Sequence, residues 1–224
     1  RRDKPPSPFN TTEFLRAATA IGFSAANAMR IAEWLYMNGY ISYPRTDNTV
    51  FPELDFRGLI GMFLRTEFSP YASELLKKER FVPTKGKKFA TDHPPIYPAA
   101  AADKESMTRE QYRIYELVVR RFFANFAEPS IWERKKVELK IGEEPFSASG
   151  IRIVKEGWRW FYPYNRFETK LLPELSVGQR LKVVKAEAVG KETKPPPRYT
   201  QGILIKKMEE LGLGTKSTRH ETLS

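Results

Sequence analysis

Residues 137–154, "VELKIGEEPFSASGIRIV", decide the fold class of this 224-residue chain. Val137, Leu139 and Ile141 fall on one face of an extended chain and the charged residues between them on the other, which is the period-two pattern of a strand. "GEEP" supplies turn residues, and "FSASGIRIV" is again typical of a strand. The stretch therefore predicts a long antiparallel hairpin.

Strand-like sequence continues beyond this hairpin. "WRWFYPY" (158–164) and "QRLKVVKAEAV" (179–189) are rich in aromatic or β-branched residues, so we expect further strands there. Residues 130–196 are accordingly predicted to be β-rich, and "KETKPPP" (191–197) predicts a linker because prolines remove backbone donors.

Helical periodicity precedes the hairpin. Asn10 and Ser24 are good N-caps for two helices, and Gly39 ends the second through its preference for left-handed backbone. The strand-like "YISYP" (40–44) follows. Two helices, a short turn and a strand resemble a helix-turn-helix or winged-helix core.

The rest of the helical region runs to about residue 129. Residues 53–80 predict two helices broken at Pro70, and the proline-rich stretch 81–102 predicts an irregular surface loop. Thr108 with Gln111 predicts a capping box at the start of "REQYRIYELVVRRFFANF". Helices followed by an antiparallel β region make the predicted fold class α+β.

Both ends of the chain also carry predictions. Prolines in "RRDKPPSP" (1–8) indicate an extended linker. Residues 198–223 predict a helix, a glycine-rich turn and the start of another helix, with Thr218 and Glu221 as its capping box. Because the chain opens without Met and stops where a helix begins, we expect it to be part of a longer protein.

The composition favours a polyanionic partner. The formal net charge is +11, and lysine and arginine gain affinity for phosphates through counterion release. A merely soluble basic surface is the alternative on charge alone. The chain has no cysteine, which excludes disulfides, thiolate zinc sites and a cysteine nucleophile. No apolar run approaches the roughly 20 residues that span a bilayer, so no membrane role is expected.

Tyr43 is the first candidate for chemistry. In an extended segment, side chains two apart share a face, so Tyr43 and Arg45 project together. A phenol is a weak nucleophile, and an adjacent guanidinium stabilises both the phenolate and an attacked phosphate. The pair suits phosphoryl transfer, although an ordinary strand tyrosine covered by arginine stays open on spacing alone.

His93 and the glycine-rich turn are the other candidates. His93 lies in the proline-stiffened "TDHPPIYPA", where it could serve a phosphate or be held by Asp92 for structural reasons. "GLGTKSTRHE" departs from a Walker A sequence because Thr215 separates glycine from lysine, so an ATP site is not supported. A helix N-terminus with Lys216 and Ser217 facing outward would still bind a phosphate, with an ordinary capped helix as the alternative. No close acidic cluster predicts a metal site.

Three segments, taken together, resemble signature segments of the type IA DNA topoisomerases. They are "GYISYPRTDN" (39–48), "TDHPPIYPAAAA" (91–102) and "RYTQGILIKKMEELGLGTKSTRHETLS" (198–224). They occur in the family's order over nearly the whole chain, and the likeness is closest to archaeal members.

The resemblance implies a set of site residues. Tyr43 would be the nucleophile that becomes linked to a 5′ phosphate of single-stranded DNA, Arg45 would hold that phosphate, and His93 would contact it or transfer a proton. The DNA-binding residues implied by the third segment are Arg198, Tyr199, Thr200, Lys216, Ser217 and Thr218. Strand cleavage, passage and religation would relax negative supercoils without ATP.

The resemblance also implies an architecture. The family forms a torus, of which 1–8 would be a linker from the arch, 9–129 the helical tyrosine domain, 130–196 a β-rich arch segment and 197–224 the start of a helical base domain. The family's Toprim domain, which carries the Mg²⁺ ligands, has no counterpart in this chain. We therefore expect a piece that binds DNA, cleaves poorly alone and holds no metal itself.

The implied partners are DNA and the remaining domains of the same enzyme, and the implied location is cytoplasmic and nucleoid-associated. A non-catalytic winged-helix module that binds DNA with the same basic surface is the alternative function.

Overall fold

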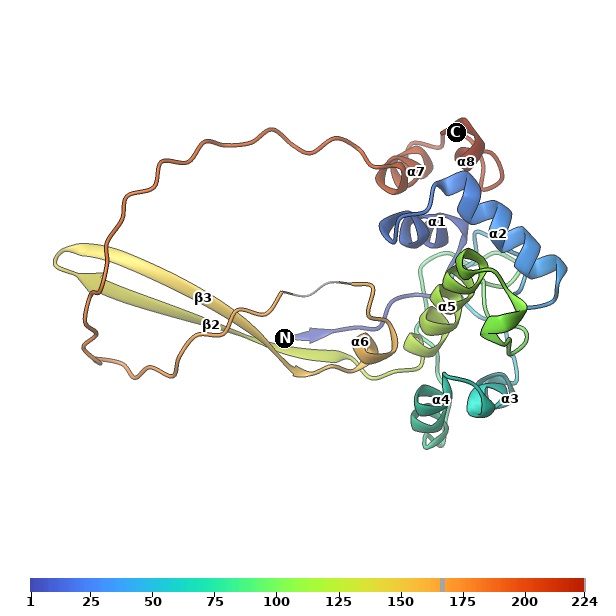
Figure 1. Cartoon of the computed structure of the whole chain (residues 1–224), viewed down its shortest axis with the longest axis horizontal. Coiled ribbons are helices and arrows are strands. Elements are labelled where there is room, and N and C mark those ends of the chain that lie inside the picture. The colour runs from blue at the N-terminus through green and yellow to red at the C-terminus, as the bar shows by residue number, and fades with distance from the viewer. Residues whose placement is uncertain (166–167, 224) are drawn as a thin grey trace.

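The predicted hairpin is present. The computed structural model describes residues 1–165 and 168–223. β2 (Ser130–Ile141) pairs antiparallel with β3 (Glu144–Lys155), and Gly142 turns the chain between them with a φ of 61°. β1 (Arg2–Asp3) adds to β2, so the sheet has the order β1-β2-β3. Figure 1 shows this hairpin extending well away from the helical part of the chain.

The aromatic stretch after β3 is a helix, so the strand prediction for 158–164 is wrong. α6 (Trp158–Phe161) follows Gly157, whose φ of 56° turns the chain out of the sheet. Trp158 and Phe161 are both buried. Their spacing of three residues puts both rings on one helical face, and burial of that face overrides the strand propensity of the aromatic residues.

The strand prediction for 179–189 is also wrong. Within the described ranges this segment forms no strand, and Leu181, Val183 and Val184 are exposed. Strand-like residues form a strand only when a neighbouring strand accepts their backbone hydrogen bonds. Lys170 forms one bridge with Ile151, after which the chain leaves the sheet (Figure 1).

The helical body surrounds α5 (Arg109–Ala124), most of whose apolar side chains are buried. The other helices around it are α1 (Thr11–Ala20), α2 (Ala25–Met37), α3 (Phe56–Gly61), η1 (Met62–Arg65), α4 (Ser69–Leu76) and η2 (Lys104–Ser106). Pro70 lies in the first turn of α4, so the predicted break falls just before it. The loop 81–102 is irregular, as predicted.

The predicted caps of the first helices are confirmed. Asn10 accepts a hydrogen bond from the Glu13 amide at 2.9 Å, and Ser24 accepts one from Asn27 at 3.2 Å. Gly39 has a φ of 76°. The "YISYP" segment is extended but makes only a single-residue bridge, between Ile41 and Pro98, in place of the predicted strand.

The capping box of α5 gives a stability prediction. Thr108 Oγ1 accepts from the Gln111 amide at 3.3 Å, and Gln111 Oε1 accepts from the Thr108 amide at 2.9 Å. We expect Thr108→Ala to lower the free energy of unfolding by about 1 kcal/mol because it leaves a helix donor uncapped. Urea denaturation measures it, with Thr193→Ala in the exposed 168–200 segment as the control. An unchanged Thr108→Ala midpoint would refute the role of the cap.

The C-terminal part packs on the helical body. α7 (Gln201–Glu210) lies against α1, and α8 (Arg219–Thr222) lies near α2. A side chain at Gly202 would meet Thr19 Oγ1 at 2.3 Å and Arg16 Cα at 3.2 Å, so the close contact of α7 with α1 requires glycine there. The predicted order of helix, turn and helix in residues 198–223 is confirmed.

The predicted capping box at the start of α8 is wrong. The Thr218 side chain makes no cap hydrogen bond to α8. Thr218 Oγ1 accepts from the Thr215 amide at 3.0 Å instead. The hydroxyl therefore closes the preceding turn, because a threonine side chain satisfies local backbone in turns as readily as at helix starts.

Candidate active site

The segment after Tyr43 is held by the first turn of α1. Thr11 Oγ1 lies 2.8 Å from the Pro44 carbonyl oxygen and 2.9 Å from the Thr46 amide, which donates to it. The Thr11 amide donates to the Thr46 carbonyl at 2.9 Å. These contacts are buried, so α1 fixes the position of the chain on which Tyr43 and Arg45 stand.

Tyr43 lies between two rings. Its centroid is 4.7 Å from the His93 ring, at a tilt of 57°, and 5.1 Å from the Tyr36 ring, which meets it edge-on. Tyr43 is partly exposed. The phenol is therefore restrained on two sides and still open to solvent.

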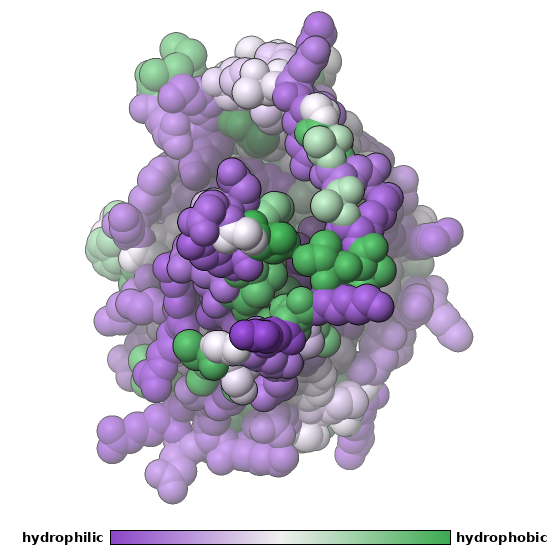
Figure 2. Space-filling model, turned by 90° about the vertical axis from the view of Figure 1, so that its left-hand side faces the viewer, coloured by the Kyte–Doolittle hydropathy of each residue, from purple (hydrophilic) through white to green (hydrophobic). Residues whose placement is uncertain are grey.

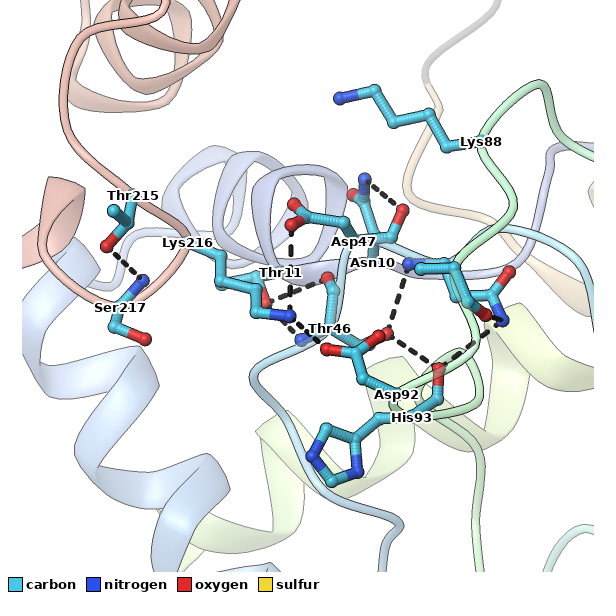
Figure 3. Close-up of polar contacts among 12 residues, drawn as sticks. Asn10, Thr11, Thr46, Asp47, Lys88, Asp92, His93, Thr215, Lys216 and Ser217 are labelled. Atoms are coloured by element: carbon cyan, nitrogen blue, oxygen red, sulfur yellow. Dashed lines mark hydrogen bonds and ion pairs between the residues drawn. The ribbon is translucent and has the colours of Figure 1, made fainter.

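The His93 loop is tied to the Tyr43 loop through backbone. The His93 carbonyl oxygen accepts from Thr46 Oγ1 at 3.1 Å and from Asn48 Nδ2 at 3.3 Å. Figure 3 shows Thr46 and His93 close together. Asn48 Nδ2 also donates to the Ala90 carbonyl at 2.8 Å. Two segments that are 47 residues apart in sequence are thereby brought together.

Arg45 points toward α2 and the C-terminal turn. Its Nε donates to Glu33 Oε1 at 2.8 Å, and a second guanidinium nitrogen donates to the same oxygen. A third donates to the Ser217 carbonyl at 2.8 Å. The fork is therefore fixed by partners from two elements, and the described residues show no hydrogen bond from it to Tyr43.

Lys216 is paired, in contrast to the outward-facing cation that the sequence predicts. Its Nζ lies 2.5 Å from Asp92 Oδ2 and 3.8 Å from Asp47 Oδ2. Figure 3 shows Lys216 reaching between these two carboxylates. A partly exposed lysine gains little from one partner. Here, however, Lys216 joins the C-terminal turn to both loops that carry Tyr43 and His93.

His220 lies beside Arg45 and was not singled out from the sequence. The side chain is buried, and burial lowers the pKa of His220, with the positive charge of Arg45 as the next cause. His220 lies in α8, close enough to Arg45 for the guanidinium charge to act on the imidazole.

A scan against protein families identifies the chain. The family model described as DNA topoisomerase matches residues 1–224, and the match therefore covers the whole chain. The chain belongs to the type IA DNA topoisomerase family.

Individual topoisomerases agree with this assignment. DNA topoisomerase 1 of Archaeoglobus fulgidus is 47% identical over 218 residues, which are 97% of this chain and 33% of that protein. DNA topoisomerase 1 of Thermoplasma acidophilum is 42% identical over 219 residues, which are 97% of this chain and 28% of that protein. The chain spans about a third of the length of these relatives.

A solved topoisomerase has the same fold. The structure of full-length topoisomerase I from Thermotoga maritima matches with a TM-score of 0.69 at 25% identity, over 100% of this chain and 38% of that one. The resemblance found in the sequence to archaeal type IA topoisomerases is confirmed.

The predicted site residues of this topoisomerase chain fall into two groups. Tyr43, Arg45, His93, Lys216 and Ser217 belong to one contact network, with Thr218 in the turn beside it. Arg198, Tyr199 and Thr200 lie at the start of α7, where Thr200 caps the helix by accepting from the Ile203 amide at 3.3 Å. The structure therefore does not join the start of α7 to the network around Tyr43.

Sequence reasoning missed Glu33, Asp47 and the pairing role of Asp92. Glu33 lies 12 residues before Arg45, and no local spacing rule links them because Gly39 reverses the chain between the two. Asp47 and Asp92 did carry a signal. Each follows a threonine inside one of the segments that resemble this topoisomerase family, Asp47 two residues after Arg45 and Asp92 directly before His93.

Neither a metal cluster nor a membrane helix is found in the described part of the chain. Residues 1–165 and 168–223 hold no group of three or more histidine, aspartate or glutamate side chains placed to bind a metal ion. None of the helices in these ranges combines the length and the apolar composition that crossing a bilayer requires.

The ion pair between Lys216 and Asp92 in this topoisomerase chain leads to a prediction about the pKa of Asp92. The hydrogen bond from Lys216 and that from the His93 amide hold the pKa of Asp92 below its usual value of 3.8. We expect Lys216→Met to raise the pKa of Asp92 toward that value, as measured by NMR titration of the carboxyl carbon.

The ion pair between Asp92 and Lys216 depends on pH. Because the pKa of Asp92 is lowered in the folded state, the stabilisation from this ion pair is present above the usual pKa of Asp92 and is lost as the pH falls through the folded-state pKa. Glu138, whose pKa is lowered by Lys136 on the hairpin, is the matched control and should not change. An Asp92 titration that Lys216→Met leaves unaltered would show that the ion pair is absent in solution.

Proposed function

We propose that this chain forms the tyrosine-bearing part of a type IA DNA topoisomerase. The enzyme cleaves one DNA strand through a 5′-phosphotyrosine link, passes a strand and religates, and so relaxes negative supercoils without ATP. The observation that carries this is the network around Tyr43, in which Arg45, His93 and Lys216 come from three segments far apart in sequence. A purely structural tyrosine would not need this convergence of phosphate-binding groups.

The proposed step breaks one phosphate ester bond and forms another. The Tyr43 hydroxyl oxygen attacks a DNA phosphorus, forming a P–O bond to tyrosine and breaking the bond to the 3′ oxygen. The phenol proton leaves to His93 or water, and the departing 3′ oxygen gains a proton. Since one phosphate ester replaces another, the 3′ hydroxyl can later reverse the step without an energy source.

Each neighbour has a proposed role. Arg45 holds the scissile phosphate and stabilises the charge that develops on it, which preorganised cations do best where water is partly excluded. His93 contacts the phosphate or transfers a proton. Lys216, Ser217 and Thr218, with Arg198, Tyr199 and Thr200, bind the single strand.

The domain organisation is part of the proposal. Residues 1–8 enter from an arch, 9–129 form the tyrosine domain with a winged-helix-like core, 130–196 form an arch segment and 197–224 begin a helical base, in a toroidal enzyme. The long hairpin and the exposed apolar residues of 179–189 support an arch completed by chain outside these residues.

Magnesium belongs to a different part of the enzyme in this proposal. The carboxylates near Tyr43 do not fit a metal site, because Asp47 and Asp92 both face the Lys216 ammonium. A Toprim domain outside this chain would hold Mg²⁺, and the remaining domains of the same protein are the expected partners. The proposed location is the nucleoid.

The test is covalent capture of DNA. The chain is mixed with labelled single-stranded DNA, with and without a Toprim-containing segment and Mg²⁺, and the products are separated under denaturing conditions. We expect protein–DNA adducts when the Toprim-containing segment and Mg²⁺ are present and few adducts when they are absent. Salt-dependent binding with no adduct even in the mixture that contains the Toprim segment and Mg²⁺ would instead support a non-catalytic DNA-binding module.

A further inference from the structure

Tyr36 stands directly beside the proposed nucleophile. The centroid of its ring lies 5.1 Å from that of Tyr43, at an interplanar angle of 64°. The Tyr36 residue is 40% exposed. Within residues 1–165 and 168–223 its hydroxyl makes no hydrogen bond, and its ring contacts no aromatic ring besides that of Tyr43. The Tyr36 ring therefore has surface left for a further partner.

The aromatic residues on either side of Tyr36 in sequence are used differently. Trp34 stacks on Tyr40 with a centroid distance of 6.1 Å, and Tyr40 also meets Tyr115 edge-on at 6.2 Å. Tyr115 is fully buried, so this row of rings runs into the core. Tyr36 stays outside that row and shares the surface with the partly exposed Tyr43.

The backbone that carries Tyr36 is fixed before any ligand binds. Tyr36 lies in the last turn of α2, where the Gly39 amide donates to the Tyr36 carbonyl at 2.9 Å. Asn38 Nδ2 donates to the Trp34 carbonyl at 2.8 Å. A tyrosine side chain has only two rotatable bonds, so an exposed ring on a capped helix end loses little conformational freedom when it binds.

The position of Tyr36 relative to the phosphate-binding groups indicates what it meets. Tyr36 lies three residues after Glu33 on α2, and Glu33 holds the Arg45 guanidinium. A nucleotide linked to Tyr43 through its 5′ phosphate carries its base one sugar away from that phosphorus. Arg45 can hold the phosphate, whereas an uncharged ring binds bases by stacking. The base of this nucleotide is therefore the part of DNA that reaches Tyr36.

The apolar surface of the hairpin belongs to a different part of the molecule. Ile141, Phe146 and Val154 are exposed there. Figure 2 views the molecule from the hairpin end and shows a hydrophobic patch within a mostly hydrophilic surface. In Figure 1, α2 lies on the side of the helical body away from the hairpin. The exposed hairpin residues are therefore not candidates for contact with a base at Tyr43.

We propose that Tyr36 stacks on the base of the nucleotide whose 5′ phosphate Tyr43 attacks, so that binding for cleavage depends on that base. The inference rests on the proposed function, since it takes Tyr43 as the point of attachment. Tyr36 supplies its ring and makes no bond to the phosphate. A phenylalanine at this position should therefore serve equally well.

The test removes the base and the ring separately. Single-turnover cleavage by the complete enzyme is measured on a labelled single-stranded oligonucleotide with one mapped cleavage site, and on the same oligonucleotide with an abasic residue directly 3′ of the scissile bond. The enzyme concentration that gives half of the maximal rate reports binding. Loss of one stacked base should weaken binding by wild type about 10-fold.

The ring variants show whether Tyr36 makes that contact. We expect Tyr36→Leu to bind the intact oligonucleotide about 10-fold more weakly than wild type and to bind the abasic one no more weakly than the intact one. Tyr36→Phe keeps the ring and should behave as wild type on both. Trp160→Leu is the matched control, because Trp160 is 39% exposed and packs against another tyrosine, Tyr71, at 4.7 Å. It should keep the wild-type difference between the two oligonucleotides.

The results that would overturn the proposal are distinct. A merely structural Tyr36 would leave the effect of base removal equal in wild type and Tyr36→Leu, whatever the variant does to the rate itself. Equal binding of the two oligonucleotides by wild type would overturn the proposal without any variant, so the test holds even if Tyr36→Leu does not fold.

The outcome is separable from that of the proposed function. An intact oligonucleotide that gives no adduct on Tyr43 of the wild-type enzyme would refute the proposed function. Adducts on Tyr43, together with an effect of base removal that Tyr36→Leu leaves unchanged, would refute the stacking contact alone.

Discussion

Tyr43→Phe should abolish covalent attachment to DNA, lowering the adduct yield by at least about 1,000-fold, as expected when a nucleophile is removed. The change deletes one oxygen and keeps the ring between His93 and Tyr36, so packing and DNA binding should be preserved. The measurement is denaturing electrophoresis of labelled single-stranded DNA after incubation with the complete enzyme.

Tyr36→Phe is the matched control. Tyr36 packs edge-on against Tyr43 and is 40% exposed, but its hydroxyl has no place in the proposed reaction. It should keep most of the adduct yield. Adducts that persist in Tyr43→Phe and vanish in Tyr36→Phe would move the nucleophile to the other ring.

Arg45→Ala should slow cleavage by about 100- to 1,000-fold, the usual cost of losing one preorganised group that stabilises charge in a transition state. The guanidinium is fixed by Glu33 and the Ser217 carbonyl, so its position is set before DNA binds. Single-turnover cleavage rates in the complete enzyme measure the effect.

Two variants separate chemistry from simple loss of charge. Arg30→Ala removes an exposed arginine of α2 that donates only to Asn27 within the described residues, and it should stay within a few-fold of wild type. Arg45→Lys keeps the charge but not the planar fork, so it should recover only part of the rate. An Arg45→Ala rate equal to that of Arg30→Ala would remove Arg45 from the mechanism.

Local sequence predicted the elements whose signals are local. Asn10, Ser24 and Thr108 cap their helices as expected because capping depends on residues three apart. The hairpin at 137–154 was predictable for the same reason, since alternation and a turn lie within one stretch.

Predictions failed where a distant partner decides the structure. "WRWFYPY" has strand propensity, but burial of Trp158 and Phe161 makes it a helix. The 179–189 segment has strand-like residues and no neighbouring strand in the described chain. The Thr218 hydroxyl could cap α8 or bond to the preceding turn. It accepts from the Thr215 amide in that turn, and α8 is left without the expected side-chain cap.

The sequence predicted which residues form the candidate site, but it did not predict which residues they contact. The sequence pointed to Tyr43, Arg45, His93 and Lys216 from three segments. It did not predict that Glu33 positions Arg45, because that contact depends on the reversal of the chain at Gly39. Nor did it predict that Asp47 and Asp92 pair with Lys216, because that depends on where the loop 81–102 returns to the helical body. Spacing alone placed Arg45 beside Tyr43, whereas the hydrogen-bond partners of Arg45 lie on α2 and in the C-terminal turn.

The attachment point of DNA tests the central claim most directly. An adduct trapped on the complete enzyme is digested, and the peptide that carries the nucleotide is sequenced by mass spectrometry. The proposed function predicts a 5′ phosphate on Tyr43, in the peptide that contains "SYPR". A nucleotide on any other residue, or a linkage through a 3′ phosphate, would contradict it.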